Sequence, residues 1–327
     1  MIWKGKRVLV TGAGGFIGSH LAERLVTLGA TTRALVHYNA LGSWGWLDHS
    51  PMRRDLEVVA GDICDRDSVR DAIDGVDIVF HLAALIAIPY SYRAPASYVR
   101  TNIDGTLNVL QVARDLGIER LVHTSTSEVY GTARYTPIDE AHPLQGQSPY
   151  SASKIGADKM AEAFRLSFGL PVVTVRPFNT FGPRQSARAV LPTIMSQCLA
   201  GRTVKLGKLS PTRDLNFVAN TVDGFVLAAS APGAVGHTLN LGSGREISIG
   251  DLARLTASIA GCDVTIEADD ARLRPEGSEV ERLLADGSLA KAVLGWEPLV
   301  SLEDGLRQTL EWMRSNVGSY RPDLYTV

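Results

Sequence analysis

The sequence predicts an α/β protein that contains a doubly wound parallel sheet and a smaller mixed α/β lobe. Short runs of β-branched and aliphatic residues alternate with helical periodicity through the first half of the chain, a pattern typical of parallel strands joined by helices. A glycine-rich turn separates the first of these strands from the first helix. After Pro177, glycines and prolines divide the sequence into shorter pieces, which indicates a second lobe.

The elements of the sheet follow from the hydrophobic pattern, because a parallel strand buried on both faces reads as a continuous apolar run. Strands are expected at 7–11, 31–37, 57–60, 77–82, 120–124 and 172–176, and helices at 16–28, 65–74, 96–116 and 150–168. The segments 216–230 and 238–241 read as a return to the sheet, and further helices are expected at 248–260 and 301–314.

The composition is that of an ordinary globular protein and excludes some partners. The 327 residues are 45% hydrophobic and 21% charged, with a net charge of −2. A chain without basic excess is not expected to bind nucleic acid or an anionic membrane. Cys64, Cys198 and Cys262 fit no metal-ligand spacing, so we expect buried, reduced thiols and no metal site. The first residues enter a strand without a signal peptide, and the longest apolar stretch is too short to span a bilayer, so a cytoplasmic location is expected.

The glycine-rich turn predicts a dinucleotide site. Gly12, Gly15 and Gly18 lie where the backbone must turn sharply, approach a pyrophosphate and pack a helix on a strand. The N–H groups that begin the next helix attract an anion. In this strand–turn–helix context the motif indicates a Rossmann-type domain. We assign residues 1–177 and about 215–242 to it, and about 178–214 and 243–327 to a substrate domain.

Other strand ends carry weaker signals for the same cofactor. Asp62 follows the third strand, where it either bonds the adenine amino group or caps the helix that begins near Asp65. The fourth strand ends in small residues, as a close cofactor requires. The second strand ends at His37 without the acidic residue expected to bind a ribose 2′-hydroxyl. Arg33 lies too early in that strand for a 2′-phosphate, so NAD and NADP both stay open, with NAD favoured.

Four residues in two neighbouring segments carry the signal for chemistry. Tyr150 and Lys154 are four residues apart and therefore lie on one face of a helix. There the ammonium can lower the pKa of the phenol, so that it removes a hydroxyl proton. Thr126 and Glu128 follow the preceding strand, and the carboxylate adds a base that a plain alcohol oxidation does not need. The alternative for Tyr150 and Lys154 is an exposed pair on a helix surface without a catalytic role. The alternative for Glu128 is a solvated or helix-capping carboxylate.

These motifs carry a family resemblance that runs nearly end to end. With Thr11–Gly18, His81–Ala84, Ser125–Gly131, Tyr150–Lys154, Arg176–Arg184 and Leu294–Pro298, the chain resembles the extended short-chain dehydrogenases/reductases that modify nucleotide sugars. The segments 84–92 and 145–158 are similar to those of the soluble UDP- or GDP-N-acetylglucosamine 4,6-dehydratases of bacillosamine and legionaminic acid synthesis.

The resemblance implies a redox-neutral dehydration. Tyr150, assisted by Lys154 and Thr126, would deprotonate the sugar 4-hydroxyl while hydride leaves C4 for the nicotinamide. Glu128 would take the C5 proton, the C6 hydroxyl would leave as water, and hydride would return to C6. Ser127 stands where dTDP-glucose dehydratases carry an aspartate as general acid, whereas GDP-mannose dehydratases resemble this chain there. We therefore expect Glu128 to pass the proton to the departing hydroxyl, with retention at C5 and a tightly bound, recycled cofactor.

The resemblance also implies sets of binding residues and a dimer. The cofactor is expected to contact Gly12, Gly15, Phe16, Ile17, Gly18, Asp62, Ile63, Leu82, Ala83, Ala84, Tyr150, Lys154 and Pro177. The nucleotide sugar is expected to contact Ile88, Tyr90, Ser91, Asn179, Arg188, Val190, Arg213 and Arg274. A planar guanidinium suits two phosphate oxygens, although Arg213 and Arg274 could instead pair with Asp214 or Glu276. The helices at 96–116 and 150–168 imply a homodimer through a four-helix bundle.

Three alternatives and one unusual motif stay open. UDP-glucuronate decarboxylases and nucleotide-sugar 4-epimerases share parts of these motifs, and a non-catalytic dinucleotide-binding regulator is a third alternative. The decarboxylases usually have a more basic sequence around the tyrosine, and an epimerase needs no carboxylate at Glu128. Trp44 and Trp46 stand close to the cofactor turn, where they either cover a ligand or pack a loop.

Overall fold

The computed structural model describes residues 3–201 and 203–320, so the ends of the predicted domains at 1–2 and 321–327 lie outside the described residues. Seven parallel strands form the main sheet in the order β10-β6-β5-β4-β1-β2-β3. Their bounds are β1 (Arg7–Thr11), β2 (Thr31–His37), β3 (Leu56–Gly61), β4 (Ile78–His81), β5 (Arg120–Thr124), β6 (Val172–Pro177) and β10 (Thr238–Leu241). The predicted doubly wound parallel sheet is confirmed.

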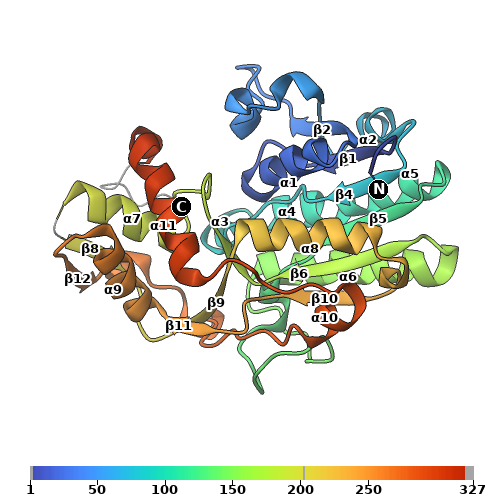
Figure 1. The fold of residues 1–327 in the computed structure, drawn as a ribbon. Coiled ribbons are helices and arrows are strands. Elements are labelled where there is room, and N and C mark those ends of the chain that lie inside the picture. Colours follow the sequence, from blue (N-terminus) through green and yellow to red (C-terminus); the bar gives the residue numbers. More distant parts are fainter. Residues whose placement is uncertain (1–2, 202, 321–327) are drawn as a thin grey trace.

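Helices cover both faces of this sheet (Figure 1). One face carries α1 (Phe16–Thr27) and α8 (Val218–Ser230), and the other carries α2 (Arg66–Ile73), α5 (Gly105–Asp115) and α6 (Pro149–Phe168). Successive residues of a strand point to opposite faces. Val8 and Val10 of β1 accordingly pack in one hydrophobic cluster and Leu9 in another. This two-sided burial explains the continuous apolar runs of the sequence.

A smaller group of elements lies beside the carboxyl ends of the strands (Figure 1). It contains a three-stranded sheet of β7 (Asn179–Phe181), β9 (Thr212–Phe217) and β11 (Glu246–Ser248), and a pair of β8 (Thr203–Leu206) and β12 (Thr265–Ala268). Its helices are α7 (Val190–Ala200), α9 (Ile249–Ala260) and α11 (Leu302–Asn316), which pack on one another, while α10 (Ser288–Leu294) lies against α8 and β10. The division into two domains remains our proposal.

The predicted helix at 96–116 is not one regular helix. It consists of α4 (Pro95–Tyr98), a π-helical segment at Val99–Asp104 and α5, and it follows the short helix α3 (Ile88–Arg93). The π segment carries Asn102, whose amide donates to the Leu85 carbonyl at 3.0 Å and to the Ser153 hydroxyl at 2.9 Å. Such widened turns often occur next to functional sites. Periodicity alone could not reveal this, because the bonds of Asn102 join segments distant in sequence.

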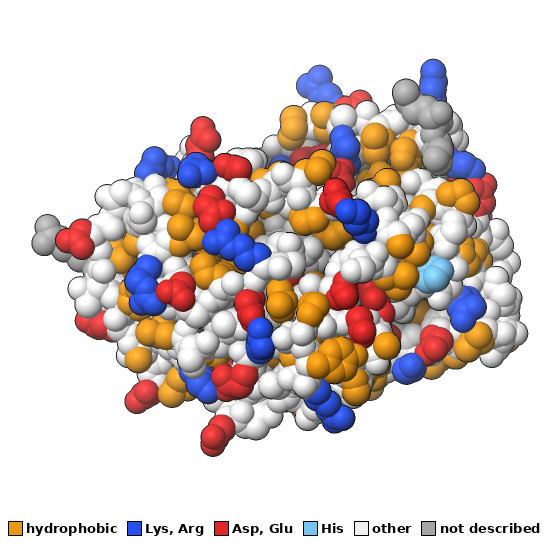
Figure 2. All heavy atoms as spheres, turned by 60° about the horizontal axis from the view of Figure 1, so that its bottom comes forward, with side chains coloured by type: hydrophobic (Ala, Val, Ile, Leu, Met, Phe, Trp, Pro, Cys, Tyr) orange, Lys and Arg blue, Asp and Glu red, His pale blue; other side chains and the backbone are white. Residues whose placement is uncertain are grey.

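The face of the molecule drawn in Figure 2 shows acidic and basic side chains interspersed. No broad field of a single charge dominates that face. Within the part of the chain that the structure describes, no helix combines the length and apolarity needed to cross a bilayer, and no group of three or more potential ligands is arranged for a metal ion. The three cysteines are free, with Cys198 buried and Cys64 and Cys262 partly exposed.

Candidate active site

The glycine-rich turn is closed tightly against the end of β4. Gly12 has a φ of +70°, and a Cβ added there would lie 2.9 Å from the backbone nitrogen of Ala83. An added Cβ at Gly18 would collide with the Gly12 carbonyl oxygen. Side chains are therefore excluded at both positions. No side chain caps α1 at Gly15, so the N–H groups that begin this helix keep their affinity for an anion.

The end of β4 is bonded to the same turn. The Thr11 hydroxyl accepts hydrogen bonds from the backbone nitrogens of Leu82 and Ala83, both at 3.0 Å, and contacts Nδ1 of His81 at 2.9 Å. Leu82, Ala83 and Ala84 are partly exposed beside Phe16 and Ile17, which are also partly exposed. The structure thus brings the two predicted cofactor segments together.

The residues after β3 are held by local bonds. Asp62 accepts the N–H of Cys64 at 2.9 Å, whereas Asp65 caps α2 by accepting the N–H of Ser68 at 2.9 Å. Of the two interpretations of Asp62, the helix cap is therefore wrong, because Asp65 makes that cap. The hydrogen bond from adenine to Asp62 remains a prediction. Ile63 is buried.

The guanidinium of Arg33 is bonded to groups of the protein itself. Its guanidinium donates to the carbonyl oxygens of Ala72 at 2.8 Å and Asp74 at 2.9 Å, and it pairs with Glu57 at 2.9 Å. The expectation that Arg33 lies too early in β2 is consistent with these bonds, which join β2, β3 and the end of α2.

Tyr150 and Lys154 lie at the start of α6, as predicted. Ser148 caps this helix in a reciprocal pair with Ser151, and Pro149 occupies its first turn, a strong start signal. The ring of Tyr150 packs edge-on against Tyr98, with ring centroids 6.2 Å apart. Burial raises the pKa of Tyr150, and the side chain of Thr126 opposes that rise.

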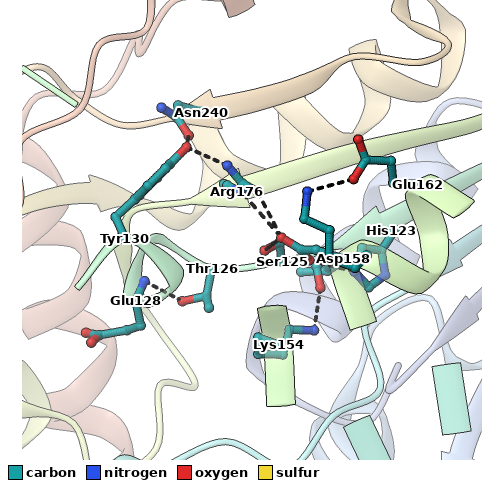
Figure 3. A network of polar contacts seen from close by, with 12 residues as sticks. His123, Ser125, Thr126, Glu128, Tyr130, Lys154, Asp158, Glu162, Arg176 and Asn240 are labelled. Carbon is teal, nitrogen blue, oxygen red and sulfur yellow. Dashed lines mark hydrogen bonds and ion pairs between the residues drawn. The ribbon is translucent and has the colours of Figure 1, made fainter. Parts of the chain in front are cut away.

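Burial decides the raised pKa of Tyr150, and the expected lowering of that pKa by Lys154 stays a prediction. The ammonium of Lys154 donates to the carbonyl oxygen of Thr124 at 2.6 Å (Figure 3). Lys154 is 4% exposed, and burial lowers its pKa to about 8 although the charge of Asp158 opposes that shift. The lysine is thus held close to the end of β5 in a nearly dry environment.

Glu128 lies on the short 3-10 helix η4 (Ser127–Tyr130), which follows β5. The Thr126 hydroxyl caps η4 by accepting the N–H of Glu128 at 3.3 Å (Figure 3). The carboxylate of Glu128 points away from Lys154 in that view. Its charge adds to the rise in the pKa of Tyr150 that burial causes, and it opposes the burial that lowers the pKa of Arg213, so the carboxylate lies near both. Ser127, at the position of the missing acid, is buried.

The two predicted diphosphate arginines share one carboxylate. Arg213 and Arg274 lie 3.2 Å and 3.8 Å from Oε1 of Glu279. The alternative pairing with Asp214 is wrong, because Asp214 is buried and accepts the N–H groups of Ser243, Gly244 and Ala285. The two guanidinium groups carry donors whose geometry suits the oxygens of an anionic ligand.

The remaining predicted substrate residues are unequally exposed. Asn179 is partly exposed, and none of the described residues bonds its buried Oδ1. Arg188 is exposed and Val190 partly exposed at the start of α7. On α3, Tyr90 is 38% exposed, whereas Ile88 and Ser91 are buried and the Ser91 hydroxyl donates to the Ile88 carbonyl. Pro177 is buried at the end of β6.

Sequence reasoning missed three residues that complete this site. Tyr98 packs between Tyr90 and Tyr150, and its hydroxyl donates to the Ala87 carbonyl at 2.7 Å. Glu279 pairs with the arginines, and Asp158 is buried one turn after Lys154. Only Asp158 had a local signal, because a carboxylate four residues after the lysine falls on the same buried helix face.

The comparisons with known proteins agree on one family. The family described as GDP-mannose 4,6 dehydratase matches residues 9–309. A UDP-glucose 4-epimerase of Mycolicibacterium smegmatis is 36% identical over 94% of this chain and 99% of its own length. A dTDP-glucose 4,6-dehydratase of Streptomyces niveus is 33% identical over 97% of this chain and 95% of its own. DesIV, a dTDP-glucose 4,6-dehydratase of Streptomyces venezuelae solved with NAD bound, has a TM-score of 0.87 and 32% identity, covering 97% of this chain and 99% of DesIV.

Proposed function

The chain belongs to the GDP-mannose 4,6 dehydratase family of extended short-chain dehydrogenases/reductases, and we propose that it is an NAD-dependent 4,6-dehydratase of UDP- or GDP-linked N-acetylglucosamine. The observation that carries this proposal is the presence of Glu128 beside Tyr150 and Arg213. A phenol and a carboxylate at one site supply the two separate bases that oxidation at C4 and elimination across C5 and C6 require.

The residues present fit a dinucleotide. The bare glycine turn at Gly12 and Gly18 excludes side chains where a pyrophosphate approaches, and the uncapped start of α1 offers its N–H groups,. NAD, when bound, would accept the hydrogen of sugar C4 with its electron pair and return it to C6. Arg33 is paired with Glu57 and is therefore not free to bind a 2′-phosphate. This pairing favours NAD over NADP.

The protein side chains would divide the proton transfers. Tyr150 would take the proton of the sugar 4-hydroxyl, with the Thr126 side chain and the Lys154 ammonium supporting the phenolate. Glu128 would take the C5 proton and deliver it to the departing C6 hydroxyl, since Ser127 is buried and carries no acidic group. Glu128 would then take up a proton from solvent and return it to C5 on the same face, which would retain the configuration there, while Tyr150 would release its proton in turn.

The diphosphate would lie between Arg213 and Arg274, which both contact Glu279, because guanidinium groups suit phosphate oxygens. Asn179 offers a buried oxygen without a partner among the described residues, which a sugar hydroxyl would satisfy by donating to it. Tyr90 and Arg188 would contact the outer part of the ligand. The subgroup preference for an N-acetyl sugar rests on the resemblance of segments 84–92 and 145–158.

A nucleotide-sugar 4-epimerase is the second candidate, favoured by the 36% identity to the mycobacterial epimerase. Incubation with UDP- and GDP-N-acetylglucosamine and with UDP-glucuronate, followed by mass spectrometry, separates the alternatives. A dehydratase product loses the mass of one water. An isomer of unchanged mass and altered retention indicates epimerisation, loss of carbon dioxide indicates decarboxylation, and no conversion of any sugar nucleotide favours a non-catalytic protein.

We further propose a cytoplasmic homodimer in which α5 and α6 of two copies form a four-helix bundle. The two helices pack on one another within the chain, so their outer faces would meet a second copy. Light scattering of the purified protein tests the dimer: a mass equal to one chain would contradict it.

A further inference from the structure

Asp158 is a buried carboxylate for which the proposed reaction has no direct use. It is 5% exposed and lies on α6, four residues after Lys154. Burying a charge is costly unless it is paired and hydrogen-bonded. Its oxygens contact Nε2 of His123 at 3.0 Å, the hydroxyl of Ser125 at 2.7 Å and Nη2 of Arg176 at 3.1 Å (Figure 3).

The network extends beyond these three partners. Arg176, also buried, donates from Nη1 to the hydroxyl of Tyr130 at 2.9 Å, and Tyr130 donates to Oδ1 of Asn240 at 2.8 Å. One connected set of polar contacts thus joins α6 to β5, β6, η4 and β10 (Figure 3). Because each member is held by a charged or polar neighbour, the relative positions of these elements are narrowly defined.

The partners of Asp158 are adjacent in sequence to the residues that would react. Ser125 stands between Thr124, whose carbonyl oxygen accepts the Lys154 ammonium, and Thr126, which caps η4. Tyr130 ends η4, the element that carries Glu128. A shift of α6 along β5 would therefore change the position of the lysine relative to the groups on β5 and η4 together.

We propose that Asp158 is a positioning residue: it fixes α6 to the ends of β5 and β6, so that Lys154 and Tyr150 keep their places relative to Thr126. This inference rests on the proposed function but concerns a residue that does not touch the substrate. A second effect is electrostatic. Lys154 forms no ion pair within the described part of the chain, and Asp158 is the carboxylate whose charge raises the pKa of this lysine.

Other titratable groups near Lys154 do not replace that charge. Burial lowers the pKa of His81 and of His123, so both imidazoles are neutral at neutral pH and oppose the lysine only if protonated. Tyr150 and Tyr98 have raised pKa values, so before a substrate binds neither supplies a negative charge beside Lys154. Arg176 is itself paired with Asp158. Loss of the carboxylate should therefore let Lys154 lose its proton at lower pH.

The test is Asp158→Asn in the full chain, which keeps the size of the side chain and most hydrogen bonds. With the sugar nucleotide that the parent enzyme converts, kcat should fall about tenfold to a hundredfold, the effect of a misplaced reacting group, while KM and the NAD Kd measured by tryptophan fluorescence change little. The alkaline limit of the kcat pH profile should move to lower pH. Glu162→Gln is the matched control, because Glu162 lies on the same helix and its ion pair among the described residues is with exposed Lys159.

Ser125→Ala is a second, milder variant in case Asp158→Asn fails to fold. It removes one hydrogen bond to Asp158 and leaves the charge of that carboxylate in place. It should lower kcat by a smaller factor and leave the alkaline limit in place. Equal kcat and equal pH profiles for the parent and both variants would overturn the inference, as would losses that Glu162→Gln reproduces. A parent enzyme that converts no sugar nucleotide would instead overturn the proposed function, and the two failures are thereby distinguished.

Discussion

At the scale of single residues, the site combines groups that the sequence predicts with groups that it does not. Tyr150, Lys154 and Glu128 are recognisable because each stands in a short local motif. Glu279 is not, because its partner Arg213 is distant in sequence and their contact depends on how the chain folds. The pKa of Tyr150 was also beyond prediction, since burial decides its direction and sequence spacing carries no information on burial.

Lys154 should reduce stability near neutral pH. Its folded pKa is about 8 against an ordinary value of 10.5, so between these values the unfolded chain holds a proton that the folded chain has lost. Stability contributed by this residue therefore rises with pH through that window. Relative to Lys154→Met, the parent should gain about 2 kcal/mol of unfolding free energy between about pH 7 and about pH 10.

Urea unfolding of both proteins at the two pH values measures this difference, in which all other titrating groups cancel. Lys159→Met, at an exposed lysine of the same helix, is the control and should show no such gain. Parallel stability curves for the parent and Lys154→Met would show that the lysine is not held in a dry environment.

At the scale of elements, the sequence predicted the strands of the main sheet well, since burial on both faces leaves a strong apolar signal. In the second lobe it predicted the helices α9 and α11 within one or two residues but none of the strands. Strands such as β7 and β11 span three residues each, too few for a periodicity to be detected. The π-helical segment at Val99–Asp104 escaped prediction because tertiary bonds of Asn102 accompany it.

Gly18, in the first turn of α1, should not tolerate a side chain. In Gly18→Ala the new methyl group would collide with the Gly12 carbonyl oxygen, which must move and carry the pyrophosphate turn with it. We expect NAD affinity, measured by calorimetry, to fall at least about tenfold, since a displaced turn loses its anion contacts. Gly233→Ala, where no atom lies within 4 Å of the added Cβ, should bind NAD like the parent.

At the scale of the whole molecule, aromatic rings join the cofactor turn to the second lobe. The backbone N–H of Trp46 donates to the Gly14 carbonyl at 3.0 Å, and its ring packs edge-on against Trp312 of α11 with centroids 5.4 Å apart. Trp312 in turn contacts Tyr320. The sequence suggested that Trp44 and Trp46 cover a ligand or pack a loop, and the structure shows loop packing for Trp46.

Removing the Trp46 ring should weaken the contact between the two lobes. Trp46→Ala should lower the free energy of unfolding by about 1–2 kcal/mol, the range of a partly buried aromatic pair, and should speed the release of bound NAD in a dilution experiment. Leu41→Ala in the same loop removes a side chain that is 92% exposed and should change neither quantity. Unaltered stability in Trp46→Ala would mean that the lobes are held together elsewhere.

The central claim is that a phenol and a carboxylate act on one hexose, and Glu128→Gln in deuterated water tests it most directly. Glutamine keeps the size and hydrogen bonding of the side chain but removes no proton. The parent should place deuterium at C5 of a product that has lost water. The variant should still reduce the nicotinamide, seen as absorbance, yet incorporate no deuterium at C5 and release no water. Normal turnover with C5 labelling by Glu128→Gln would contradict the account.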